Sequence, residues 1–290
     1  MAEAIDALDR AFARTADTVA PQRAHVEIDA GSLLVMPAAG PSGAGVKLVT
    51  VNPSNPERGL PLINGVYVLF EPGTLVPVAV FDGAALTGLR TAAVSGLATR
   101  YLARPDAHRL VIFGAGVQAA THLDAMVKVL PIRTVTVVSR TRSRADELVD
   151  RARRSGLDAS TGTSDSVADA DVVCTCTTSN EPLFDGALLK PGTHVNAIGA
   201  FEPDARELDD ATVGAARIVV EDRSAALEEA GDLILPLRSG AITAGDIVAD
   251  LSEVVAGLEV RGDPKHITVF KSVGLALEDL AVASAAAENF

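Results

Sequence analysis

The sequence predicts an α/β protein in which a domain built on a parallel sheet is joined to an α+β domain. After residue 105, apolar runs rich in β-branched residues alternate with helical stretches, which is typical of a parallel sheet. Before residue 105, shorter apolar runs and a hairpin turn indicate an antiparallel sheet with flanking helices. The length of 290 residues, 48 % of them hydrophobic, suits two folded domains.

The first hundred residues carry the local signals of the antiparallel sheet. Ile5, Leu8 and Phe12 recur at helical spacing. Glu71-Pro72-Gly73-Thr74 predicts a hairpin turn, since proline presets one turn residue and glycine accepts positive φ. Asp82 is a suitable helix N-cap. The expected strands are 26–28, 33–36, 46–51, 65–70 and 75–80, and the expected helices are 4–14 and 82–101.

The remaining residues predict strands and helices in the alternating order of a parallel sheet. The strands are expected at 109–113, 134–138, 171–177, 193–199 and 217–221, and the helices at 117–128, 144–154 and 273–289. Arg261-Gly262-Asp263-Pro264 interrupts the helical pattern, so the chain is expected to return to the first domain there. The predicted domains are residues 1–105 with 264–290, and residues 106–263.

Composition and charge limit the kinds of partner that the protein is expected to bind. The net charge of −13 repels phosphate backbones, so nucleic-acid binding is not expected. No apolar run reaches membrane-spanning length, and an acid at Glu3 is unlike a secretion signal, so a cytoplasmic location is expected. Cys174 and Cys176 share an apolar run and are expected to be buried thiols. The five histidines lack ligand spacing, so they are interpreted as structural and no metal site is expected.

A glycine-containing turn between a strand and a helix predicts a dinucleotide site of the Rossmann type. Gly114 permits the tight turn after strand 109–113, and Gly116 permits close approach of a pyrophosphate. Ala119 is small enough for the helix to pack on the sheet, and the helix N-terminus offers N–H groups to phosphates. The alternative is an ordinary strand-to-helix turn.

The end of the next strand predicts NADPH rather than NAD. An acidic residue there would bind the ribose hydroxyls of NAD, but residues 139–144 contain only serine, threonine and arginine. Ser139 and Thr141 supply hydroxyls, and Arg140 and Arg144 supply guanidinium groups that suit a 2′-phosphate. The alternative is a basic, solvated helix start, although arginines oppose the helix dipole at that end.

Three isolated cations in the first domain are candidates for binding a substrate: Arg23, Lys47 and Arg90. Alternation puts Lys47 on the same face as Val49, so either the ammonium shares an apolar face or the lysine is a solvent-facing residue of an edge strand. Arg90 lies in a helix rich in small residues and suits a bidentate contact with a carboxylate or phosphate. The residues alone leave these roles open.

Six motifs, taken together and in order, resemble the ornithine cyclodeaminase and mu-crystallin family over nearly the whole chain. They are Met36-Pro37-Ala38, Gly45-Val46-Lys47, Leu89-Arg90-Thr91-Ala92-Ala93, Gly114 to Ala119, Val195 to Ala200 and Val269 to Gly274. That family includes archaeal-type alanine dehydrogenases and ketimine reductases. The resemblance implies a homodimer whose first domains join their sheets, which fits strands too apolar for one small domain to cover.

The resemblance also implies roles for individual residues. Arg23, Lys47 and Arg90 match cations that bind the substrate carboxylate, and Lys47 also matches a catalytic group near the reacting carbon. Ser272 and Val273 match residues that approach the substrate. The residues that match cofactor contacts are Thr91, Val117, Gln118, Thr175, Asn196, Ala197 and Ile198.

One departure from the family pattern decides the expected chemistry. Cyclodeaminases and archaeal alanine dehydrogenases carry an aspartate where this chain has Phe201, which cannot activate water. Glu202 or Asp204 is a candidate proton relay, although an acid after Pro203 also suits a helix start. The expected function is NADPH-dependent reduction of an α-imino acid to an α-amino acid. The alternatives are a cyclodeaminase-type lyase, an alanine dehydrogenase-like enzyme, and a non-catalytic NADPH-dependent binding protein.

Overall fold

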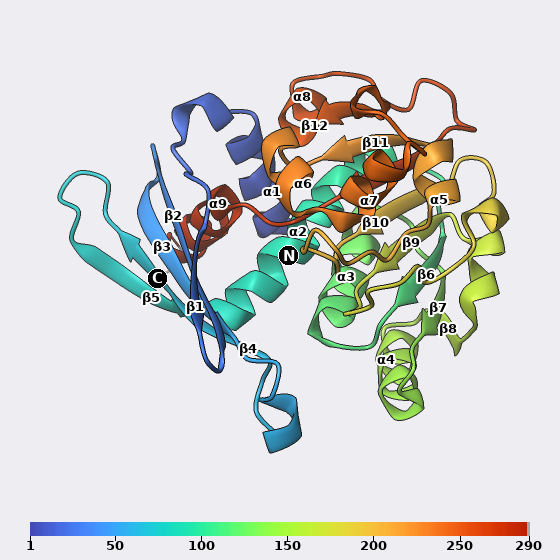
Figure 1. Ribbon diagram of the computed structural model, residues 1–290, viewed down its shortest axis with the longest axis horizontal. Helices are drawn as coiled ribbons and strands as arrows, with labels where there is room; N and C mark the ends of the chain where they lie inside the picture. Colours follow the sequence, from blue (N-terminus) through green and yellow to red (C-terminus); the bar gives the residue numbers. More distant parts are fainter. Residues whose placement is uncertain (289–290) are drawn as a thin grey trace. The chain divides into compact units, whose positions relative to one another are not determined.

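The computed structural model describes residues 1–288, which divide into two compact units (Figure 1). The antiparallel-sheet unit comprises Ala2–Thr91 and the chain from Gly274 onward. The parallel-sheet unit comprises Met1 and Ala92–Val273. The α/β class and both kinds of sheet expected from the sequence are confirmed.

The antiparallel-sheet unit contains a five-stranded sheet in the order β1-β2-β3-β4-β5. Its strands are β1 (Ala24–Ile28), β2 (Gly31–Gly40), β3 (Gly43–Val51), β4 (Ile63–Phe70) and β5 (Pro77–Asp82). Helix α9 (Ala276–Ala287) packs against β2 and β3 on one face and against α1 (Ala2–Phe12). The predicted hairpin is therefore present as β4 and β5. Asp82 caps the following helix, since its Oδ1 accepts the N–H groups of Ala84 and Ala85 at 2.8 and 2.9 Å.

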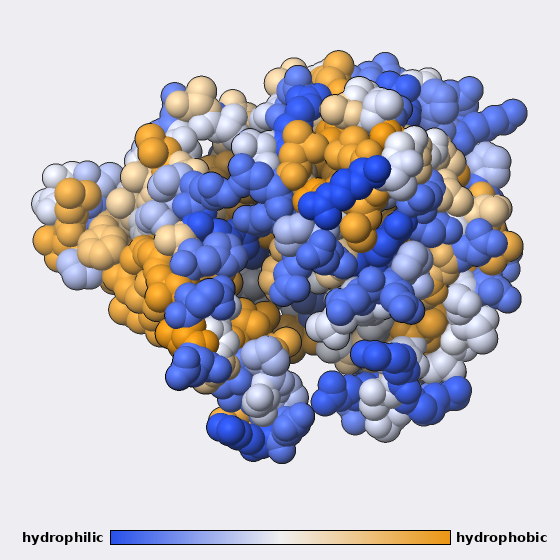
Figure 2. Space-filling view, in the orientation of Figure 1, coloured by the Kyte–Doolittle hydropathy of each residue, from blue (hydrophilic) through white to orange (hydrophobic). Residues whose placement is uncertain are grey.

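The two faces of this sheet differ in what covers them. Met36, Lys47 and Tyr67 lie opposite one another on adjacent strands and are buried on the face that carries α9. The other face presents apolar side chains to solvent, including Val26, Val66 and Val80, the last of which is 69 % exposed. Figure 2 shows hydrophobic surface, in orange, over the part of the molecule at the left where Figure 1 draws this sheet.

The parallel-sheet unit contains an eight-stranded parallel sheet in the order β12-β11-β13-β10-β9-β6-β7-β8. The strands are β6 (Arg109–Phe113), β7 (Thr134–Val138), β8 (Asp158–Thr161), β9 (Val172–Thr175), β10 (His194–Ala197), β11 (Ala216–Val220), β12 (Ile247–Asp250) and β13 (Ile267–Lys271). The helices are α3 (Val117–Val129), α4 (Arg142–Arg154), α5 (Asp210–Ala215), α6 (Arg223–Glu229), α7 (Gly231–Ser239) and α8 (Leu251–Val255). Two separate hydrophobic clusters include alternating residues of the same strands, so both faces of the sheet are buried.

The two compact units of the structure do not begin and end at the residues where the predicted domains do. Helix α2 (Gly83–Leu102) crosses the first boundary, which lies after Thr91 rather than at residue 105. The second lies after Val273 rather than at residue 263, because β13 pairs with β10 and β11 inside the parallel sheet. The break at Pro264 marks the entry to a strand, not a change of domain. The closing helix begins at Ala276, three residues later than expected, and Asn289 lies outside the described residues.

The cysteines and the two most buried histidines have structural environments. Cys174 and Cys176 are free thiols, and burial raises the pKa of Cys174 to about 12. His122 and His194 are fully buried, and burial lowers their pKa values to about 4 and about 3. Both rings are therefore neutral at pH 7. None of the helices within residues 1–288 is long and apolar enough to cross a membrane.

Candidate functional site

The glycine turn between β6 and α3 has the backbone geometry that the sequence predicts. Gly114 has φ of +104°, and a Cβ at this position would overlap the carbonyl oxygen of Cys176. Glycine is therefore required there for the turn itself. Gly116 is the N-cap of α3, with φ of −93°, and a Cβ there would meet open space. The absence of a side chain at Gly116 thus leaves room beside the helix N-terminus.

The start of α3 is suited to binding phosphate groups. No side chain caps the helix, so the N–H groups of its first turn have no side-chain acceptor. Val117 is 69 % exposed at the first helical position, and Gln118 has a buried side-chain oxygen without a hydrogen-bond partner in the described residues. Open space, free N–H groups and the positive end of a 13-residue helix fit the pyrophosphate of a dinucleotide.

In residues 139–144, which follow β7, two of the three arginines are not held by another side chain of the described residues. Arg142 is held by Asp146, with its Nε 3.0 Å from Oδ1. Arg140 and Arg144 are exposed and have no side-chain hydrogen bond or ion pair within residues 1–288. The N–H of Thr141 donates to Ser139 Oγ at 3.3 Å, which holds the Ser139 hydroxyl in the turn before α4. The expected preference for NADPH at this segment stays a prediction.

Two residues that are predicted to contact the cofactor, at the ends of β9 and β10, have side chains that are hydrogen-bonded inside the protein. The Thr175 hydroxyl donates to Glu207 at 2.6 Å, and Asn196 Nδ2 donates to Thr99 Oγ1 at 2.9 Å. Both side chains are fully buried. Ala197 and Ile198 are also buried, so any contact of this segment with a nucleotide falls to the backbone. The cofactor roles of these four residues and of Thr91, which is buried on α2, stay predictions.

Glu207 fixes these strand ends, and no local pattern in the sequence predicts this role. Its carboxylate accepts hydrogen bonds from Thr175, from the N–H and hydroxyl of Thr177, and from the N–H of Gly199. Asp232 in turn accepts the N–H groups of Glu207 and Leu208 and pairs with Lys271 at 2.8 Å. Burial and the nearby Asp232 charge raise the pKa of Glu207. The loop after β10 is thereby tied to the sheet.

A buried group of charges occupies the antiparallel-sheet unit. Lys47 Nζ lies 2.7 Å from Asp279 Oδ2 and 2.9 Å from Oδ1, and Arg90 Nη1 lies 2.7 Å from Glu278 Oε2. Arg90 Nε is also 3.5 Å from Asp279 Oδ1. Lys47 is only 2 % exposed and Asp279 is 0 % exposed. Lys47 therefore lies on the buried face with Val49, and its interpretation as a solvent-facing edge lysine is wrong.

This environment changes the acid–base properties of Lys47. Burial lowers the pKa of its ammonium to about 8, although the neighbouring Asp279 carboxylate acts in the opposite direction. Arg90 lowers the pKa further by charge repulsion. An amine with this pKa exchanges protons near neutral pH, which an ordinary surface lysine does not.

Gly274 brings the third predicted cation to the same place. Arg23 Nη2 donates to the carbonyl oxygen of Gly274 at 2.6 Å. Gly274 has φ of +83°, and a Cβ there would overlap the guanidinium of Arg90. Both arginines thus contact one glycine, and Asp279 links Arg90 to Lys47. The structure gathers Arg23, Lys47 and Arg90, while their role in binding a substrate stays a prediction.

Three other predicted site residues have clear surroundings. The Ser272 hydroxyl donates to Glu221 Oε1 at 2.5 Å, and the Val273 N–H donates to Oε2 at 3.0 Å, so Glu221 fixes this segment. Asp204 is different, because its side chain is 90 % exposed and lies 3.5 Å from Arg238. This solvated position gives no support to Asp204 as a proton relay, and that role stays a prediction.

Comparison with known proteins identifies the family. The model of the ornithine cyclodeaminase/mu-crystallin family matches residues 1–290. The chain belongs to this family. The family resemblance of the six motifs is thus confirmed. Ketimine reductase mu-crystallin of Rattus norvegicus is 39 % identical over 268 residues, which cover 92 % of this chain and 82 % of the rat protein.

Solved structures of family members superimpose closely on the chain. Thermococcus litoralis Δ1-pyrroline-2-carboxylate reductase, in complex with NADH and L-proline, gives a TM-score of 0.94 at 36 % identity. The match covers 98 % of this chain and 91 % of the other. An archaeal alanine dehydrogenase dimer with bound NAD also gives a TM-score of 0.94 at 36 % identity, covering 99 % and 90 % of the two chains.

The two glycines of the turn should respond differently to the same substitution. Gly114→Ala is expected to lower the free energy of unfolding by about 1–3 kcal/mol, because positive φ and overlap with Cys176 strain the backbone. Gly116→Ala should change stability by less than about 1 kcal/mol but weaken nucleotide binding about tenfold, because its methyl group enters the open space. Urea unfolding and fluorescence titration with NADPH measure the two effects. Unchanged NADPH affinity in Gly116→Ala would contradict the assignment.

Proposed function

We propose that this protein reduces a cyclic or linear α-imino acid, such as pyrroline-2-carboxylate or piperideine-2-carboxylate, to the α-amino acid with NADPH. The protein is an oxidoreductase of the ornithine cyclodeaminase/mu-crystallin family. The observation that carries the proposal is the convergence of the half-buried Arg23 with the buried Arg90 and Lys47, which suits a carboxylate beside a proton donor. The related Thermococcus litoralis reductase, solved with L-proline, supports the same substrate class.

When bound, NADPH would supply the hydride that the imine carbon accepts. The chain's own residues bind the carboxylate and deliver the proton that the imine nitrogen needs. Arg23 and Arg90 provide guanidinium groups for the carboxylate oxygens, and their fixed contacts lower the entropy lost on binding. Lys47 donates its proton to the imine nitrogen, and Asp279 holds the ammonium in place. The expected substrate contacts of Ser272 and Val273, and the expected proton relay by Asp204, stay predictions.

The direct test is NADPH oxidation by the purified protein, followed at 340 nm. Pyrroline-2-carboxylate, piperideine-2-carboxylate, and pyruvate with ammonia or methylamine are the imine sources. We expect turnover with at least one cyclic imino acid. Release of ammonia from ornithine with catalytic NAD would instead identify a cyclodeaminase. Saturable binding of an imino acid without hydride transfer would identify a binding protein.

The preference for NADPH over NADH is part of the proposal, since the two solved relatives hold NADH and NAD. It is supported by Arg140 and Arg144, which have no partner within residues 1–288, and by a segment without an acidic residue at 139–144. The start of α3 would hold the pyrophosphate through its N–H groups.

Replacing Arg140 should separate the two nucleotides. Arg140→Ala is expected to raise KM for NADPH about tenfold or more and to leave KM for NADH nearly unchanged, because only NADPH carries the 2′-phosphate. Arg142→Ala is the matched control, and it should have a smaller effect because Arg142 is already paired with Asp146. A wild-type protein that uses NADH more efficiently than NADPH would overturn the assignment.

The pH dependence of kcat should follow Lys47. The active ammonium is lost as pH rises through about 8, so kcat should fall across that range. Asp279→Asn removes a carboxylate that raises the pKa of Lys47, and it should move the midpoint to lower pH. Glu278→Gln should move it less, since Glu278 has the weakest influence on Lys47. Steady-state rates from pH 6 to 10 measure the midpoints, and an unmoved midpoint in Asp279→Asn would refute this role of Lys47.

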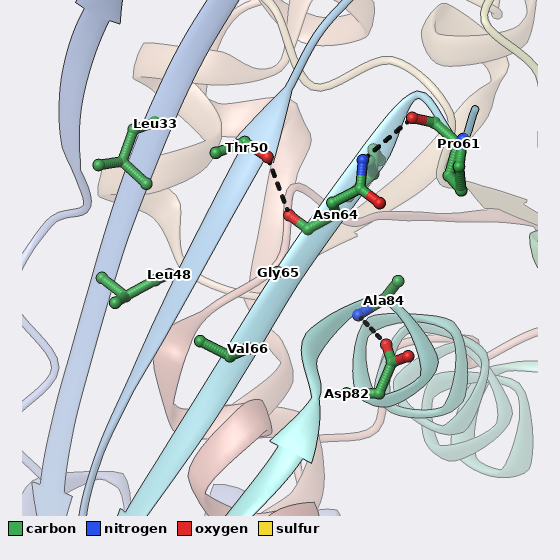
Figure 3. A pocket seen from close by; sticks show the side chains of 10 residues that line it. Leu33, Leu48, Thr50, Pro61, Asn64, Gly65, Val66, Asp82 and Ala84 are labelled. Atoms are coloured by element: carbon green, nitrogen blue, oxygen red, sulfur yellow. Dashed lines mark hydrogen bonds between the residues drawn. The ribbon is translucent and has the colours of Figure 1, made fainter. Parts of the chain in front are cut away.

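We further propose a homodimer formed through the apolar face of the antiparallel sheet. Leu33, Leu48 and Val66, from three adjacent strands, line a shallow depression of about 540 Å³ on this face (Figure 3). Exposed apolar surface of this extent is typical of an interface. The related archaeal alanine dehydrogenase is a dimer. The cytoplasmic location expected from the sequence stays a prediction.

A charge on this face should abolish the dimer. Light scattering after gel filtration is expected to give twice the 29.8 kDa chain mass for the wild type and the single mass for Leu48→Lys, because a buried unpaired ammonium opposes association. Leu258→Lys places the same charge at an exposed leucine of the parallel-sheet unit and should leave the dimer intact. A monomeric wild type, or a dimeric Leu48→Lys, would contradict the interface.

A further inference from the structure

Tyr67 has a buried hydroxyl with no hydrogen-bond partner among the described residues, and it lies on the strand next to Lys47. It lies on β4, and its Cα is paired with that of Lys47 on β3. The side chain is 0 % exposed, and its hydroxyl makes no hydrogen bond within residues 1–288. Burying a hydroxyl without a hydrogen-bond partner costs free energy. Such groups are therefore rare unless a ligand or a water molecule supplies the missing hydrogen bond.

The position of this hydroxyl is fixed by a glycine. A Cβ at Gly45 would overlap both Oη and Cζ of Tyr67, so the end of the tyrosine ring lies directly over the Gly45 backbone. On its other side, the ring contacts Phe81 at a centroid distance of 6.4 Å. Gly45 precedes Lys47 by two residues on the same strand and faces the same side of the sheet. The hydroxyl is thus held on the face that carries Lys47.

The surroundings keep this hydroxyl a hydrogen-bond donor. Burial raises the pKa of the Tyr67 phenol, and the Asp279 charge raises it further. Lys47 and Asp279 already bind each other through both carboxylate oxygens. Tyr67 thus presents a neutral donor whose hydrogen bond none of the described residues accepts.

We propose that Tyr67 is a further substrate-binding residue, whose hydroxyl donates a hydrogen bond to a carboxylate oxygen of the imino acid. This assignment rests on the proposed function. The imine nitrogen of such a substrate receives its proton from Lys47, which leaves the two carboxylate oxygens as the strong acceptors. A carboxylate also replaces the missing partner with a charge-assisted bond, which is stronger than a bond to water.

Tyr67→Phe tests the assignment because it removes only the hydroxyl. We expect KM for pyrroline-2-carboxylate to rise about tenfold or more, as for loss of a hydrogen bond to a charged group, while kcat changes less than about threefold. The Tm of the unliganded variant should equal or exceed that of the wild type, because the lost hydroxyl has no partner in the free protein. A purely structural tyrosine would give the reverse pattern. Tyr101→Phe alters the only other tyrosine of the chain and should leave KM unchanged.

The possible results distinguish a failure of the Tyr67 assignment from a failure of the proposed function. If the wild type turns over the imino acid and Tyr67→Phe has an unchanged KM, the substrate-binding role of Tyr67 is refuted while the proposed function stands. A water molecule would then be the hydrogen-bond partner of the hydroxyl. A clear fall in the Tm of unliganded Tyr67→Phe would also overturn it, because the hydroxyl would then have a partner inside the protein. If the wild type reduces no imino acid, the proposed function fails and the assignment fails with it.

Discussion

The buried pairing of Lys47 with Asp279 and of Arg90 with Glu278 is the constraint on which the antiparallel-sheet unit depends. An isolated buried charge costs several kcal/mol, and removing one partner of such a pair typically costs about 3–5 kcal/mol. The pairs join β3, α2 and α9, so the last helix of the chain must return to the first strands. The position of Arg90 also requires glycine at 274, because the Arg90 guanidinium occupies the space that a side chain at 274 would need.

The parallel-sheet unit uses a similar device for a different purpose. Glu207 accepts hydrogen bonds from residues at the ends of β9 and β10, and Asp232 connects Glu207 to Lys271 at the end of β13. These side chains bind one another within the parallel-sheet unit, and they hold the backbone for which the family resemblance predicts a contact with the cofactor. By contrast, the start of α3 and Arg140 retain unused donors at the surface. Rigid strand ends and uncommitted donors are what a preorganised nucleotide site requires.

The sequence predicted the parts of this protein that depend on neighbouring residues. The hairpin, the Asp82 cap and the glycine turn each arise from a few adjacent positions. Strand β13 was missed because Pro264 interrupts the pattern just before it. The face of Lys47 was ambiguous because alternation alone does not say which side α9 covers. Its partner Asp279 is 232 residues away and looks like an ordinary acid at a helix N-terminus, so no local signal distinguishes it.

A crystal structure of the protein with L-proline and NADP⁺ bound would test the central claim most directly. We expect the carboxylate of L-proline to be held by Arg23 and Arg90, with Lys47 Nζ within hydrogen-bond distance of the amino-acid nitrogen. The Lys47–Asp279 pair should remain in place. A carboxylate bound away from these arginines, or a Lys47 that stays remote from the nitrogen, would refute the proposed substrate site.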